Sequence, residues 1–69
     1  MKLLAPNTRV SVAGLDVGGM VSQIILGVDT NNDASVQYSI VDNSGQQIAI
    51  VFREQLTPDQ HASIWHLTV

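Results

Sequence analysis

The stretch SVQYSIVDNSGQQIAIVF, residues 35–52, decides the fold of this 69-residue chain. Its first part alternates apolar and polar residues, as a half-buried strand does. Turn-forming residues follow over 42–45, with a glycine available for a positive φ angle, and alternation resumes over 46–53. Two alternating runs around a short turn that contains glycine predict a β-hairpin. The residues expected to face the core are Val36, Tyr38, Ile40, Ile48, Ile50 and Phe52.

The sequence before this hairpin predicts two more strands. Residues 20–28 are apolar and rich in β-branched side chains, too short for a typical helix, and flanked by glycines, which favours a strand. Residues 29–33 are all polar turn formers and predict a loop. Residues 9–12 alternate and predict a short strand, and the glycine-punctuated segment 13–19 connects the two strands.

After the hairpin, the alternation is interrupted around Pro58. Proline lacks an amide donor and disfavours an α conformation at the residue before it. We expect a single helical turn near residues 54–60. Residues 62–69 alternate again and predict a last strand, with a short helix from Thr57 onward as the alternative.

Five short strands with few helical residues predict an all-β fold. A chain of this size cannot bury two large sheets, and a five-stranded sheet curled into a small barrel removes exposed strand edges. We expect one domain over residues 1–69. The barrel would occupy about residues 8–69, and residues 1–7 would form a loose N-terminal arm.

The order of these elements resembles the small β-barrels of the Src-homology-3-like type, especially compact ones from bacteria and their phages. The resemblance extends over about residues 8–58 and consists of spaced apolar residues and glycines. It implies a five-stranded barrel, but this architecture hosts many unrelated functions. The segments that carry the resemblance are 9–10, 19–24, 36–38, 48–52 and 52–58.

Charge and composition narrow the classes of function. The net charge is −3, and the only cations besides histidine are Lys2, Arg9 and Arg53. This argues against nucleic acid as a partner, because phosphate neutralisation supplies much of that affinity. The absence of cysteine excludes disulfides and thiolate metal sites. No apolar run has the length of a membrane span or of a secretory signal. We expect a cytoplasmic protein, or a virion-associated one if a phage encodes it.

Two polar segments invite a metal-binding interpretation, and both fit it poorly. Residues 29–33 place oxygen ligands as a calcium loop does, but Ala34 and Ile40 stand where that loop needs glycine and glutamate. His61 and His66 are five residues apart, which places them on opposite faces of a strand. We therefore expect a plain loop, ordinary histidines, and no metal, cofactor or catalytic residue.

Aromatic residues are the natural anchors of an interaction surface, and this chain has three. Tyr38 and Phe52 fit core positions of the hairpin, which leaves Trp65 as the aromatic most suited to a surface role. The candidate interaction residues are Trp65, His66, Tyr38 and Arg53.

The balance of apolar and charged residues points to association with other protein surfaces. Apolar residues form 45% of the chain and charged residues only 13%, about half the usual charged share of about 25%. The expected function is a non-enzymatic interaction or structural module, acting as a homo-oligomer or docked on a larger partner. The alternatives are an oligomeric enzyme or small-ligand binder with its site at a subunit interface, and a regulatory nucleic-acid binder.

Overall fold

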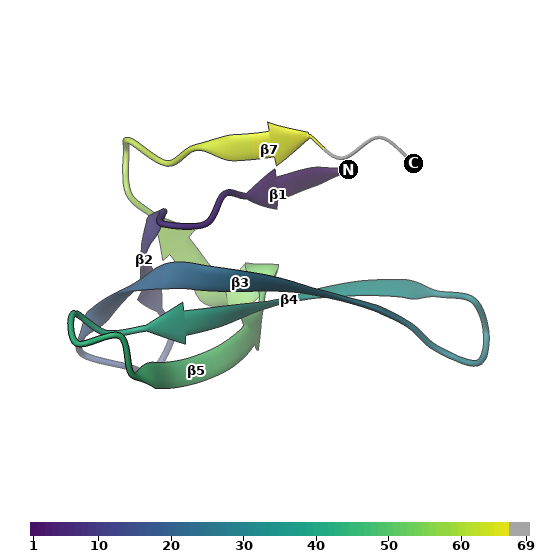
Figure 1. Ribbon diagram of the computed structural model, residues 1–69, viewed down its shortest axis with the longest axis horizontal. Helices are drawn as coiled ribbons and strands as arrows, with labels where there is room; N and C mark the ends of the chain where they lie inside the picture. Colours follow the sequence, from purple (N-terminus) through teal and green to yellow (C-terminus); the bar gives the residue numbers. More distant parts are fainter. Residues whose placement is uncertain (67–69) are drawn as a thin grey trace.

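The computed structural model describes residues 1–66, and nearly all of its regular structure is β-strand (Figure 1). This confirms the all-β class. The elements are β1 (Lys2–Leu4), β2 (Arg9–Val12), β3 (Gly18–Val28), β4 (Ala34–Val41), β5 (Gln47–Phe52), the 3₁₀ turn η1 (Arg53–Gln55), β6 (Leu56–Pro58) and β7 (Ile64–His66).

Five of these strands form one antiparallel sheet in the order β5-β4-β3-β2-β6. The chain runs up and down from β2 to β5, and η1 then leads into β6, which pairs with β2. The strands β1 and β7 form a separate two-stranded sheet that lies beside the larger one (Figure 1). The large sheet is not closed into a barrel, because β5 and β6 stand at its two ends.

The predicted hairpin is present as β4 and β5, and its turn has the expected chemistry. Gly45 adopts a φ angle of 86°, and the amide of Asp42 donates to the carbonyl of Gln46 at 2.9 Å. The long hairpin of β3 and β4 is closed by the predicted polar loop. There Asp29 Oδ1 accepts hydrogen bonds from the amides of Asn31 and Asp33.

The face assignment of β5 from the sequence is wrong. Val41 pairs with Gln47 whereas Ile40 pairs with Ala49, so one extra residue lies between these two pairs. A slip of one residue turns every later side chain to the opposite face. Consequently Val51 is buried, whereas Ile50 and Phe52 are 48% and 44% exposed.

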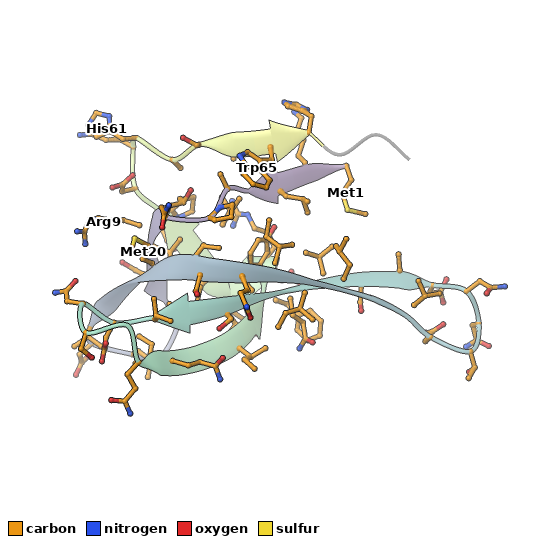
Figure 2. The ribbon with its side chains drawn as sticks, in the orientation of Figure 1. Met1, Arg9, Met20, His61 and Trp65 are labelled. Atoms are coloured by element: carbon orange, nitrogen blue, oxygen red, sulfur yellow. The ribbon has the colours of Figure 1, made fainter. Side chains whose placement is uncertain are left out.

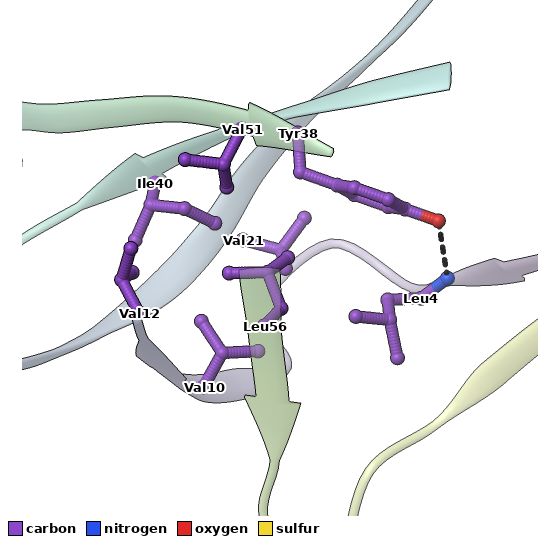
Figure 3. Packing of buried hydrophobic residues seen from close by; sticks show 8 residues of the cluster. All are labelled: Leu4, Val10, Val12, Val21, Tyr38, Ile40, Val51 and Leu56. Carbon is purple, nitrogen blue, oxygen red and sulfur yellow. Dashed lines mark hydrogen bonds between the residues drawn. The ribbon is translucent and has the colours of Figure 1, made fainter. Parts of the chain in front are cut away.

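The core lies where the two sheets meet, and its N-terminal contribution corrects the expected loose arm over residues 1–7. Leu4 on β1 is 1% exposed and packs in the same cluster as Tyr38 of β4 (Figure 3). The amide of Leu4 donates to the hydroxyl of Tyr38 at 3.2 Å. The core cluster consists of Leu4, Val10, Val12, Val21, Tyr38, Ile40, Val51 and Leu56.

After β5 the chain forms strands, as the sequence predicted, and not the alternative helix from Thr57 onward. The helical turn covers only residues 53–55, and the next residues are strand β6, so no helix begins at Thr57. The last strand pairs with β1 instead of joining the large sheet. It covers residues 64–66 of the expected 62–69, and residues 67–69 lie outside the described part.

Candidate functional site

Two of the four candidate interaction residues lie together on β7. Trp65 is 54% exposed and pairs with Leu3 of β1, and His66 is exposed and pairs with Lys2 (Figure 2). Adjacent residues of a strand point to opposite faces. Trp65 and His66 therefore contribute to two different sides of the small sheet, although they share one element.

The other two candidates lie elsewhere. Tyr38 is 1% exposed and its hydroxyl accepts the hydrogen bond from Leu4, so it belongs to the core and not to a surface site. Arg53 is exposed in η1, where its guanidinium donates to the carbonyl of Leu56 at 2.9 Å. The four residues thus do not form one site.

Sequence reasoning missed an apolar surface on the outer face of β3, β4 and β5. Cross-strand pairing places Ile25, Gln37 and Phe52 in one row. The neighbouring row on the same face consists of Gln23, Ser39 and Ile50. Ile25, Ile50 and Phe52 are all exposed there, and we call these three residues the outer apolar face.

The strand β5 is also an edge of the large sheet. No charged residue and no proline occurs from Asn43 to Phe52. Soluble proteins commonly protect an edge strand with lysine, other charges or proline. This uncharged stretch indicates an unprotected edge strand, but sequence reasoning used it only to predict the hairpin.

Two polar hollows lie around Arg9 and Asp59. The larger hollow has a volume of about 430 Å³ and the smaller about 250 Å³, and both are lined by these two residues. The backbone joins them as well, because the amide of Asp59 donates to the carbonyl of Arg9 at 3.1 Å. The other residues that line the larger hollow are Val10, Ser11, Gly18, Gly19, Asn43, Thr57 and Pro58.

The carboxylate with a shifted pKa has a structural role. The hydroxyl of Ser44 donates to Asp42 Oδ1 at 2.6 Å, and the amides of Gln46 and Ser44 donate to the same oxygen. These hydrogen bonds stabilise the charged carboxylate and lower the pKa of Asp42 from its usual 3.8. Asp42 therefore holds the β4–β5 turn together.

Residues 1–66 contain neither a metal-binding cluster nor a membrane-spanning helix. No group of three or more His, Asp or Glu side chains is placed to hold a metal ion. No helix in this part of the chain has the length and apolar character needed to cross a membrane. His61 lies exposed before β7, and its amide donates to Asp59 Oδ1 at 2.9 Å (Figure 2).

The surface of residues 1–66 has three features suited to binding. It combines the outer apolar face, the exposed β7 with Trp65, and the polar hollows at Arg9 and Asp59. No known family, no characterised protein and no solved structure matches the chain.

Proposed function

We propose that this protein is a non-enzymatic interaction module that associates with itself or docks on a larger assembly. The observation that supports this most is the outer apolar face on an edge of the sheet. Phe52 and Ile50 are nearly half exposed although the core has room for few side chains. Large apolar side chains exposed side by side, as Ile50 and Phe52 are on β5, are typical of a binding site.

The fold that we propose for the module is a small, incompletely closed barrel of the Src-homology-3-like type, in which β5 and β6 are not paired with each other. Its support is the strand order: four consecutive strands, a single 3₁₀ turn, and a short last strand that returns to the first. The same resemblance supports a bacterial or phage origin for the protein. The protein would then act in the cytoplasm or in the virion.

A second candidate function is the binding of a small ligand at the larger polar hollow. Arg9 offers a cation, Asp59 an anion, and Ser11 and Thr57 offer hydroxyl groups around it. A ligand that carries both a positive and a negative group would match these partners. If two copies meet at this hollow, it becomes the subunit-interface site of the alternative hypothesis.

The interaction proposal is tested by solution mass and by capture from the source organism. Light scattering should give a mass above the 7.4 kDa of one chain, or the immobilised chain should retain one protein saturably. A Trp65→Ala variant measured in parallel tests whether β7 belongs to the interface, and Val17→Ala, another exposed apolar residue, is its matched control. A native chain that stays monomeric and retains nothing contradicts the proposal.

A further inference from the structure

The open edge of β5 has the properties of a surface made for a second copy of the same strand. We propose that two copies of this chain pair antiparallel through β5, with Ile50 of one copy opposite Ile50 of the other. This inference rests on the proposed interaction function and names the partner and the strand. Four features of the described residues support it.

The first feature is the direction of the backbone groups. In an antiparallel ladder, alternate residues turn their N–H and C=O groups toward the same neighbour. The amide of Asp42 donates across the turn to the carbonyl of Gln46. Ile40 and Tyr38 of β4 alternate with Asp42 along the chain, so their N–H and C=O groups also point toward β5. There they bond their partners, Ala49 and Val51.

Ile50 and Phe52 alternate with Ala49 and Val51 along β5, so their backbone N–H and C=O groups point away from β4. The amide of Phe52 accordingly donates to Gln55 Oε1 at 3.0 Å. The amide and carbonyl of Ile50 face the same open side, where none of the described strands pairs with β5. A second Ile50 in antiparallel orientation supplies one donor and one acceptor to this pair of groups.

The second feature is the absence of edge protection at this position. The stretch from Asn43 to Phe52 carries no charge and no proline, so no like charges meet along the paired strands themselves. Gln55 occupies only the amide of Phe52. The central pair of hydrogen bonds at Ile50 therefore stays available.

The third feature is the distribution of charge at the two ends of the strand. Asp42 lies at the turn before β5, and Arg53 follows its last residue. With Ile50 opposite Ile50, Arg53 of one copy lies opposite Gln47 of the other. Glu54 follows Arg53, so one cation and one anion lie near the partner's Asp42 turn. Parallel pairing would instead place each charge beside its identical copy.

The fourth feature is the apolar surface that flanks the edge. With Ile50 opposite Ile50, two exposed isoleucines become direct cross-strand neighbours, and each Phe52 extends the same face. Cross-strand apolar and aromatic pairs are the side-chain contacts that stabilise such ladders. The result is an isologous dimer in which the outer faces of both sheets form one surface.

Sedimentation velocity over a range of concentrations tests this pairing. We expect the native chain to dimerise and Ile50→Lys to raise the dissociation constant at least tenfold, because two lysines would meet at the two-fold axis. Val28→Lys is the matched control, because Val28 is 70% exposed at the far end of the β3–β4 hairpin. This variant should dimerise as the native chain does. If circular dichroism shows that Ile50→Lys does not fold, Phe52→Lys tests the same pairing in its place.

The outcomes separate this inference from the proposed function. A dimer that is lost in Ile50→Lys or Phe52→Lys and kept in Val28→Lys supports β5 pairing. A dimer that survives both edge variants but is lost in Trp65→Ala overturns β5 pairing and leaves the interaction function standing. A native chain that is monomeric at every concentration overturns the second copy as partner, and the capture experiment alone then decides the proposed function.

Discussion

Tyr38 shows how much one residue contributes to joining the two sheets. Its ring lies in the core of the large sheet, and its hydroxyl accepts the amide hydrogen of Leu4 on β1. The residue that follows β1, Ala5, donates its amide to the carbonyl of Ser63 just before β7. The amide of Leu4 therefore faces away from β7 and needs the tyrosine hydroxyl as its acceptor.

Replacing Tyr38 by phenylalanine should lower the free energy of unfolding by about 1–3 kcal/mol, because a buried backbone donor loses its acceptor. Urea denaturation followed by circular dichroism measures this change. Ser35→Ala, an exposed position on the same strand, should leave the stability nearly unchanged. Equal stability of Tyr38→Phe and the native chain would show that the hydrogen bond contributes nothing.

Gly19 is the second residue with a specific structural requirement, here close packing. A Cβ atom at this position would lie 2.5 Å from Ile40 Cγ2 and 2.9 Å from the carbonyl oxygen of Val41. Gly19→Ala should therefore destabilise the fold by about 1–3 kcal/mol through overpacking. At the adjacent Gly18 the nearest atom would be 3.4 Å away, so Gly18→Ala should fold with nearly native stability. Thermal denaturation of both variants checks this contrast, and equal melting temperatures would contradict it.

At the scale of elements, the β4–β5 hairpin separates what the sequence determines from what it leaves open. The strands and the turn were predictable because alternation and turn chemistry are local. The faces of Ile50 and Phe52 were not, because one extra residue in a ladder has no local sequence signature. The signal is weakest in this strand, where Ile48, Ala49, Ile50 and Val51 are all apolar.

The turn of this hairpin also predicts a pH dependence. The pKa of Asp42 is lowered in the folded chain, chiefly by the hydroxyl of Ser44. A lowered folded-state pKa adds stability above the unfolded-state pKa, and this contribution is lost as the pH falls through the folded-state value. The native chain should therefore lose this part of its stability only below about pH 4, near the unfolded-state value.

Ser44→Ala removes the largest cause of this shift and should raise the pKa of Asp42 toward 3.8. Titration of the side-chain carboxyl signal by NMR measures the change. Ser35→Ala serves as the control because Ser35 lies on β4, away from the turn. A native Asp42 that titrates at 3.8 or above would refute the role assigned to the turn.

At the scale of the whole molecule, the pairing of the two ends of the chain was beyond sequence reasoning. Each of β1 and β7 is only three residues long, and their pairing joins Leu3 to Trp65 across nearly the whole sequence. Such short strands carry too little alternation to identify a partner. The candidate interaction residues were predictable to the same extent. Trp65 and His66 could be placed on one strand because they are neighbours in the sequence, whereas the positions of Tyr38 and Arg53 depended on the fold.

The open edge that β5 offers to a second copy is tested most directly by hydrogen exchange at the Ile50 amide. NMR can follow this amide at low and high protein concentration, with the amide of Tyr38 inside the sheet as a reference. We expect exchange at Ile50 to slow as the concentration rises, while exchange at Tyr38 is slow throughout. Exchange at Ile50 that is equally fast at every concentration would contradict the pairing of two copies through β5.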